Sequence, residues 1–314
     1  MNENIESSNR LSREDLKRLM AKSDGPALSL FSVQLLSFAV LSLATISLAA
    51  AHSPLRWLGV VATGLVLLMF FASMHEAGHG TAFASPGLNR IVSWISAVLM
   101  LQSPTFFREF HFEHHRRTSD PEGDPEISGA PSYLAPWPGN PLRYVAQAAG
   151  QHLMVGKAVF TIVAALLPPD SELFTWLFPY VRTPFRRDCV RECRIVTLLW
   201  IAALWFGSSL VPGFAFWLLA WPIGHLALGL FVMPEHTGLG SQGTQLHRTR
   251  SMRSNALVQR AMWHMSWHAE HHGYPAVPFH ALPELHRRLE PELENTIPGY
   301  LAFHAEALSR SLGR

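Results

Sequence analysis

The sequence predicts an all-α integral membrane protein with four transmembrane helices in two hairpins, interfacial helices, and a histidine-rich cytoplasmic cap. Three observations predict it. Hydrophobic residues make up 48% of the 314 positions, and they occur in long blocks. Four blocks come close to or exceed the roughly 20 residues that a helix needs to cross a bilayer. Eight histidines form three short clusters that follow or separate those blocks.

The four predicted spans cover residues 27–51, 57–74, 195–211 and 214–233. The first has no charged residue over its whole length, which is typical of a membrane helix. Residues 1–26 are polar and charged, so we expect a cytoplasmic N-terminal segment there and no cleavable signal peptide. The remainder, 27–314, is predicted to be one membrane domain whose cap comprises residues 75–194 and 234–314.

Charge placement predicts the orientation of the spans. Basic residues precede the first span, whereas the link at 52–56 holds one arginine and the link between spans three and four holds no charge. By the positive-inside rule, both termini and the long middle segment are cytoplasmic, as in a bacterial inner-membrane protein. Two apolar stretches of the middle segment, 88–107 and 145–167, contain polar residues. Because one extra span would move the last histidine cluster across the membrane, we interpret both as interfacial or half-buried helices.

Composition excludes some functions. The net charge is only +2, which gives no electrostatic support for nucleic-acid binding. The only cysteines, Cys189 and Cys193, are spaced i and i+4, as expected for helix residues rather than a disulfide. Two cysteines are too few for an iron–sulfur cluster, which needs about four thiolates. Any electrons that the protein uses must therefore come from a separate donor.

The three histidine clusters predict a metal site. Residues three or four apart share one face of a helix, so each cluster presents its imidazoles as one patch. Imidazole suits iron, zinc, copper and nickel, and eight such ligands exceed what one tetrahedral zinc ion uses. Two metal ions and redox chemistry are the interpretation we favour. The clustered histidines are His75, His79, His111, His114, His115, His268, His271 and His272.

Further residues are candidates for roles around the metals. His236 directly follows the fourth span, on the side of the clusters, and is a candidate ligand. His225, inside that span, is expected to be hydrogen-bonded or to line a substrate path. Residues 116–143 are expected to form an ordered loop over the site. Side chains that could orient the imidazole ligands are Glu76, Glu113, Asp120, Asp124, Glu270 and His264.

Two alternatives come from the first cluster and from metal binding in general. His75-Glu76-Ala77-Gly78-His79 satisfies HExxH, the pattern of zinc proteases, so an intramembrane protease is possible on this cluster alone. That reading has no use for the other six clustered histidines. A membrane metal carrier or sensor without catalysis is a further alternative.

The clusters in the order HxxxH, HxxHH and HxxHH, with the segments 120–125 and 271–286, resemble the membrane fatty acid desaturase family. The resemblance implies four spans, two non-haem irons held by the clustered histidines, and O₂ as co-substrate. It also implies that a histidine after the fourth span, here His236, completes the ligand set. Val232 departs from the pattern, because some members have asparagine at that position to hold a metal-bound water.

The resemblance favours a fatty acyl desaturase that introduces a C=C bond. A hydroxylase or ketolase acting on a lipid, carotenoid, hydrocarbon or sphingoid substrate remains the alternative, because the histidine clusters do not separate the two. An external electron donor, a ferredoxin or small cytochrome, is expected. Arginines 116, 117, 186, 187, 191, 287 and 288 could attract that donor or contact anionic lipid. A substrate path between spans two and four could be lined by Phe70, Phe71, Trp217 and Trp221.

Overall fold

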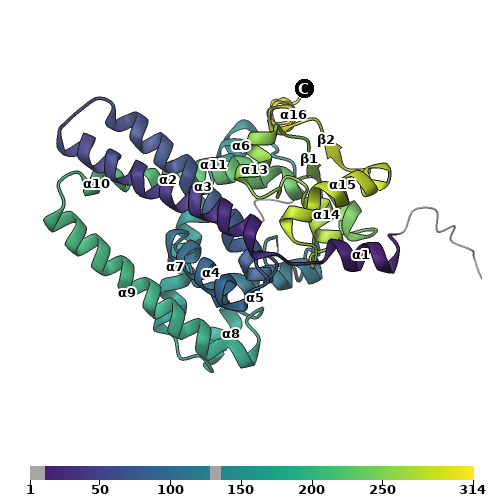
Figure 1. Cartoon of the computed structure of the whole chain (residues 1–314), viewed down its shortest axis with the longest axis horizontal. Helices are drawn as coiled ribbons and strands as arrows, with labels where there is room; N and C mark the ends of the chain where they lie inside the picture. Colours follow the sequence, from purple (N-terminus) through teal and green to yellow (C-terminus); the bar gives the residue numbers. More distant parts are fainter. Residues whose placement is uncertain (1–10, 128–135) are drawn as a thin grey trace, which may run out of the picture.

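The computed structural model of the chain is helical almost throughout (Figure 1). It describes residues 11–127 and 136–314. Within these residues, four helices are long and apolar enough to cross a membrane, which confirms the predicted fold class. The middle of the predicted 116–143 loop and the first ten residues of the N-terminal segment lie outside the described residues.

The spans form two hairpins. The first pairs α2 (Asp24–Ala50) with α3 (Arg56–His79), and the second pairs α9 (Arg186–Leu210) with α10 (Phe214–Trp217) and α11 (Ala220–His236). The α3 helix lies at the centre and packs against α2, α4 (Pro86–Leu99) and α11. Gly64 and Gly224 allow the closest approach of α3 to α11, because a Cβ at Gly64 would lie 2.8 Å from the Ala220 carbonyl oxygen. Small residues at such crossings are typical of membrane helices.

The stretch 88–107 is not the single interfacial helix that we expected. It divides into α4 and α5 (Pro104–Arg117). Leu101, between them, has a φ of 64°, and the Ser103 hydroxyl accepts a hydrogen bond from the Phe106 amide at the start of α5. The capping Ser103 and the proline that follows it are strong signals for the start of a new helix. The expectation of one helix over residues 88–107 did not take them into account.

The stretch 145–167 is also divided. It falls into the end of α6 (Pro141–Ala148) and α7 (Gln151–Leu166), with a 52° bend between the two helices. The bend lies at Gly150, whose φ is 64°. A side chain there would collide with the His225 backbone, since a Cβ would lie 1.8 Å from its carbonyl oxygen. Only glycine fits this left-handed contact between α7 and α11.

The C-terminal part forms the cap and lies at one end of the two hairpins (Figure 1). It contains the two-residue parallel pair β1 (Ser251–Met252) and β2 (Thr296–Ile297). Its helices are α12 (Gln245–Arg248), α13 (Ala256–Ala261), α14 (His268–Gly273), η2 (Phe279–Ala281), α15 (Leu282–Leu289), η3 (Glu290–Glu292) and α16 (Tyr300–Ser311). The short helices α8 (Glu172–Leu177) and η1 (Thr183–Phe185) precede α9.

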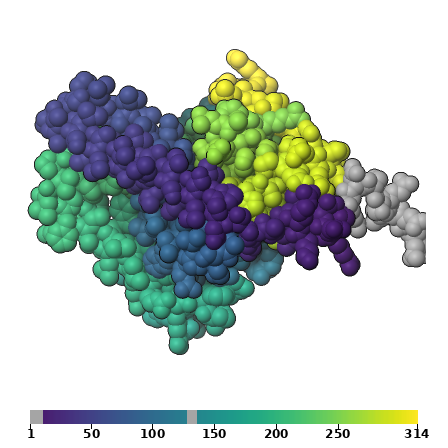
Figure 2. All heavy atoms as spheres, viewed as in Figure 1, coloured from purple at the N-terminus to yellow at the C-terminus, as the bar shows by residue number. Residues whose placement is uncertain are grey.

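The N-terminal helix α1 (Arg13–Leu19) lies against the cap (Figure 2). Arg18 is 2.5 Å from the Glu284 carboxylate, and Arg288 is 3.0 Å from that of Asp15. These pairs are solvent-exposed, so they add little to the stability of the fold. They connect the first residues of the described chain to the helix α15.

Cys189 and Cys193 are helix residues and are not disulfide-bonded, as predicted. Both are buried where α9 packs against α7.

Candidate metal centre

The helix ends position the histidine clusters. His75 and His79 occupy the last turn of α3, which Gly80 terminates with a left-handed φ of 69°. His111, His114 and His115 lie in the second half of α5, and α14 begins at His268. His236 is the last residue of α11. The ends of the spans α3 and α11 therefore place their histidines beside those of the helices α5 and α14.

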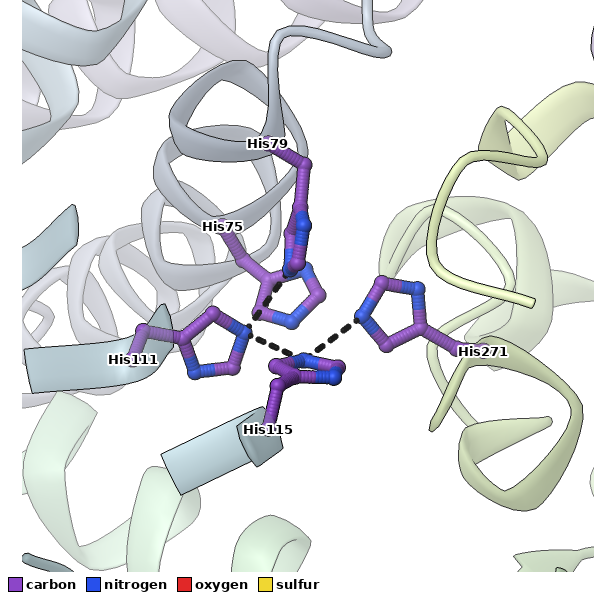
Figure 3. Close-up of side chains that lie close together, drawn as sticks. All are labelled: His75, His79, His111, His115 and His271. Atoms are coloured by element: carbon purple, nitrogen blue, oxygen red, sulfur yellow. Dashed lines mark hydrogen bonds between the residues drawn. The ribbon is translucent and has the colours of Figure 1, made fainter. Parts of the chain in front are cut away.

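Five of these histidines form the first histidine group, shown in Figure 3. Nε2 of His111 lies 2.9 Å from Nε2 of His79 and 2.9 Å from Nε2 of His115. Nε2 of His115 also lies 3.2 Å from Nε2 of His271. One candidate ligand atom from each ring lies within 4.8 Å of all the others, and the group comprises His75, His79, His111, His115 and His271.

Hydrogen bonding among the imidazoles does not account for this convergence. An imidazole nitrogen offers either one proton or one lone pair, directed along the ring plane. Nε2 of His111 and Nε2 of His115 each lie beside two other imidazole nitrogens. Each of these two atoms can form only one hydrogen bond, so at least one of its two close contacts is not a hydrogen bond. A shared cation satisfies all of them, since ligands about 2.1 Å from a metal lie about 3 Å apart at neighbouring octahedral positions.

The second histidine group comprises His114, His236, His268 and His272, all of them buried. Nε2 of His268 lies 3.0 Å from Nε2 of His236. Nε2 of His114 and Nε2 of His272 are buried without a hydrogen-bond partner, as are both ring nitrogens of His75 in the first group. An unsatisfied buried nitrogen costs about 1–3 kcal/mol, so these orphaned atoms fit two cations among the nine rings.

The adjacent histidine pairs divide between the groups. His114 and His272 belong to the second group, whereas their neighbours His115 and His271 belong to the first. Consecutive residues on a helix point about 100° apart, so one HH pair can serve two sites. The rings of His115 and His272 stack with centroids 4.0 Å apart, so the two groups share a wall. In each HxxHH cluster the first and last histidines, at i and i+4, therefore belong to one group, and the middle histidine belongs to the other.

Burial keeps most of these imidazoles neutral, as metal ligation requires. Burial, followed by the neighbouring histidines, lowers the pKa of His111, His115 and His271 well below the ordinary 6.5. The same causes lower the pKa of His268 and His272 well below 6.5. His114 is the exception. Burial acts to lower its pKa as well, but the carboxylates of Glu126 and Asp124 outweigh burial and raise it.

Among the carboxylates predicted to orient ligands, Asp124 contacts one directly. Its two oxygens lie 2.9 and 3.0 Å from Nδ1 of His114, so Nε2 is the nitrogen left for a metal. The backbone amides of Ser119 and Glu126 donate to the same carboxylate and hold it in place. Glu76 is farther away, with Oε1 3.6 Å from Nδ1 of His75 and 3.9 Å from Nδ1 of His271.

Three other candidates do not contact a clustered histidine. Glu113 forms ion pairs with Arg116 and Arg117. Asp120 accepts the Glu122 amide in the turn after α5. Glu270 pairs with the Ser251 hydroxyl and with Nδ1 of His286, which ties α14 to β1 and α15.

His264, a candidate for orienting a ligand, does not lie on the helix α14, which begins at His268. Its φ of 58° places it in a left-handed turn outside α14. Its ring stacks on Trp267 with centroids 5.0 Å apart and lies outside both histidine groups. No helix connects residue 264 to His268, so the two side chains do not share a helix face.

Three contacts to the second group were not predicted. Oε1 of Glu235 lies 3.6 Å from Nδ1 of His268, and Oε2 of Glu126 lies 3.7 Å from Nδ1 of His114. The hydroxyl of Thr118 lies 3.2 Å from Nδ1 of His272. In the sequence, Glu235 directly precedes His236, and Thr118 is three residues after His115. This proximity to a histidine is the sequence feature that could have indicated both contacts.

The structure does not favour the protease interpretation of His75-Glu76-Ala77-Gly78-His79. The Glu76 side chain has 0% exposure. Its Oε2 accepts hydrogen bonds from the Thr81 hydroxyl and the Phe279 amide. A general base must reach the water that it activates. The whole Glu76 carboxylate is buried and protein donors hold Oε2, although Oε1 has no hydrogen-bond partner.

Only one of the four aromatic residues proposed for a substrate path lies beside the histidines. The Phe71 ring centroid is 6.2 Å from that of His75. Phe70 packs on Phe38, and Trp217 packs on Trp221, whose indole donates to the Leu99 carbonyl. His225 is fully buried, with Nδ1 2.9 Å from the Trp221 carbonyl oxygen, which agrees with the predicted hydrogen-bonded role.

Two cavities reach the first histidine group. One, of about 590 Å³, is lined by His79, His115, Arg116 and Arg182, and the other, of about 710 Å³, by His79, Arg90 and Arg108. The four histidines of the second group are all buried and line neither of these two cavities. The first group is therefore accessible from outside, whereas the second is enclosed.

Comparison with known proteins agrees with this architecture. The model of the family "Fatty acid desaturase" matches residues 51–304. The sphingolipid delta(4)-desaturase DES1 of Drosophila melanogaster is 25% identical over 259 residues, which cover 79% of this chain and 70% of that protein. The match includes all nine histidines of the two groups, and the chain belongs to the fatty acid desaturase family.

Proposed function

We propose that this membrane oxidoreductase is a two-iron, O₂-dependent desaturase of a lipid hydrocarbon chain. The observation that carries the proposal is the division of nine histidines into two adjacent groups, joined by the stacked rings of His115 and His272. Imidazole nitrogens suit iron, and two neighbouring sites fit a reaction that removes two hydrogens. When bound, the irons would supply activation of O₂ and storage of electrons.

The protein's own residues would fix the sites and the substrate. Asp124 orients His114, Thr118 contacts His272, and the end of α3 holds His75 and His79. Phe71, one turn before His75, gives the membrane side of the first group an apolar wall. Because catalysis on an unactivated C–H bond depends on positioning, these contacts would select the carbon that reacts.

His75 and His79 lie at the end of the span α3, and His236 ends the span α11. The other ends of these two spans form the short links, so both termini and the site would lie on one side of the membrane. By the positive-inside rule that side is cytoplasmic. Electrons would come from a ferredoxin or a small cytochrome. Five of the seven arginines proposed to attract it already lie within 4 Å of carboxylates, which weakens that surface as a docking site. They are Arg116, Arg117, Arg187, Arg191 and Arg288.

A sphingolipid is the substrate class to test first, because the relative is described as a sphingolipid delta(4)-desaturase. A fatty acyl lipid is the second. The test is expression in a host followed by mass analysis of its lipids, with metal analysis of the purified protein. We expect about two irons per chain and products that lack two hydrogens. A gain of one oxygen would instead identify a hydroxylase, and full activity with zinc alone would refute the proposal.

A further inference from the structure

The C-terminal helix α16 exposes an apolar face. Five of its residues are exposed, and four of these five are the apolar residues Leu301, Ala302, Ala305 and Leu308. They recur three and four positions apart, so they share one side of the helix. Leu301 is 88% exposed, the highest value among the large hydrophobic residues of the described chain. A helix that faced only water would be expected to expose polar residues on this side.

The other side of α16 packs against the span α11 (Figure 1). The Tyr300 ring stacks on that of Phe231 with centroids 5.1 Å apart. Nε2 of His304 lies 2.8 Å from the Leu230 carbonyl oxygen. Leu230 belongs to the apolar span Phe214–His236, six residues before its end. At a rise of about 1.5 Å per residue, the contact lies about 9 Å along the helix axis from that end, on the side of the bilayer.

The contact between His304 and Leu230 replaces a backbone hydrogen bond that the span cannot form. In an α-helix the carbonyl of residue 230 accepts from the amide of residue 234, but Pro234 has no N–H. Nε2 of His304 donates to this carbonyl instead. Nδ1 of the same ring lies 3.3 Å from the Tyr144 hydroxyl of α6, which can donate to it. Because no water satisfies a free carbonyl at membrane depth, neighbouring helices pair such groups in membrane proteins. His304 therefore links α16 to α11 and α6.

The neighbouring helix α6 exposes apolar residues as well. It packs against both α16 and α11. Its approach to α11 is close, since a Cβ at Gly229 would lie 2.6 Å from the Ala148 carbonyl oxygen. Leu142 and Val145, one turn apart on α6, are 79% and 58% exposed. By length and composition, α6 and α7 together qualify as a span broken by the 52° bend or as a re-entrant loop. The exposed leucines of α16 thus lie beside apolar elements of the membrane domain.

We propose that α16 is a membrane-surface helix, held by His304, whose leucine face inserts among the lipids of the leaflet nearest the histidine groups. Amphipathic helices of this kind bury their apolar face roughly 5–10 Å into the boundary between headgroups and acyl chains. Lipid is favoured over a second copy of the chain, because α16 packs on a span and beside α6, which itself exposes leucine and valine. The C-terminal end of the predicted cytoplasmic cap is then in contact with the bilayer, whatever reaction the protein catalyses.

Spin labels on single cysteines test the position of α16 in the full-length protein. The variants are Leu301→Cys and Leu308→Cys, reconstituted in bilayer discs of phosphatidylcholine. Val40→Cys, on the exposed side of the span α2, is the lipid control, and Gln242→Cys, exposed in the loop after α11, is the water control. We expect both α16 labels to collide several-fold less often with a water-soluble nickel chelate than the label at residue 242. Like the label at residue 40, they should collide more often with oxygen than with nickel. Wild-type protein, whose two cysteines are buried, should take up no label.

Nickel collisions at residues 301 and 308 as frequent as those at residue 242 would overturn the inference, because the leucine face would then lie in water. Labels that neither reagent reaches would also overturn it, because another protein surface would then cover the face. A second pair of variants tests the contact that holds the helix. His304→Leu removes the donor to the Leu230 carbonyl and His304→Gln retains one, so the leucine variant alone should raise nickel collisions at residue 308. Unchanged collisions in a folded His304→Leu protein would contradict the role of His304.

Discussion

The two histidine groups are built from the same side chain but differ in access and in support. The first has five histidines, and two of them, His79 and His115, are only partly buried and line cavities. The second has four, all buried. Around the second group Asp124 and Thr118 lie within hydrogen-bond distance of ligand rings, and Glu126 and Glu235 lie 3.7 and 3.6 Å from them. Beside the first group, in the described part of the chain, Glu76 lies 3.6 Å from His75 without a hydrogen bond to it.

This difference indicates that the two sites have different roles. A ligand whose second nitrogen is hydrogen-bonded has a fixed tautomer and a fixed orientation, which strengthens metal binding. The second group has this support and is enclosed, so we expect it to hold its metal more firmly. The first group is open to cavities and lies beside Phe71, so we expect it to be the side on which substrate and O₂ approach.

The largest expected effect comes from removing one histidine from each group, because the second group has fewer ligands than the first. His272→Ala leaves three histidines in an enclosed site, so we expect loss of the second metal and no detectable turnover. His79→Ala leaves four in the first group, and we expect partial metal retention with strongly reduced turnover. Iron per chain and product formation measure both. His280→Ala, outside both groups, is the control, and two irons in His272→Ala would contradict the assignment.

Removing an orienting carboxylate should have a smaller effect. Asp124→Asn removes the charge that faces Nδ1 of His114, and we expect the affinity for the second metal to fall about 10–100-fold. Thr118→Val should cost less, because a neutral hydroxyl makes the weaker contact. Metal titration against a competing chelator gives both values. Unchanged affinity in a folded Asp124→Asn protein would show that the contact is only structural.

Chelation should distinguish the groups by rate. Because two cavities reach the first group whereas the second group's histidines are all buried, a hydrophilic chelator should remove metal in two phases. The faster phase should disappear in His79→Ala and persist in His272→Ala. A single phase, or the opposite assignment, would contradict the difference in access.

The smallest expected effect is on stability against pH in the metal-free protein. Burial lowers the pKa of His111, His115, His268, His271 and His272 below 6.5 in the folded state, so the unfolded chain binds more protons near and below that pH. Stability should therefore be full above about pH 6.5 and fall as the pH is lowered from there. His114 acts oppositely, because its raised pKa stabilises the fold at low pH and that contribution is lost as pH rises. Thermal unfolding of metal-free protein between about pH 5 and 8 measures the balance, and a midpoint that rises on acidification would contradict it.

The sequence predicted what local patterns encode. Apolar blocks predicted the four spans, and the HxxxH and HxxHH spacings predicted the residues that the structure gathers, because helix geometry puts i, i+3 and i+4 on one face. His236 was found from its place after a span. Asp124 was predicted together with other acidic residues, but Glu113 and Asp120, which are nearer to His114 in the sequence, contact arginines and the backbone instead.

What remained hidden depends on contacts between distant segments. The division of His114 from His115 and of His271 from His272 requires α5 and α14 to face each other, which no local pattern reveals. The helix breaks at Leu101 and Gly150 follow from left-handed residues packed against other helices.

The most direct test of the two-site account is the position of metal in the folded protein, determined by diffraction at the absorption edge of iron. We predict two anomalous peaks, one among His75, His79, His111, His115 and His271 and one among His114, His236, His268 and His272. A single peak, or peaks that appear only at the zinc edge, would contradict the account.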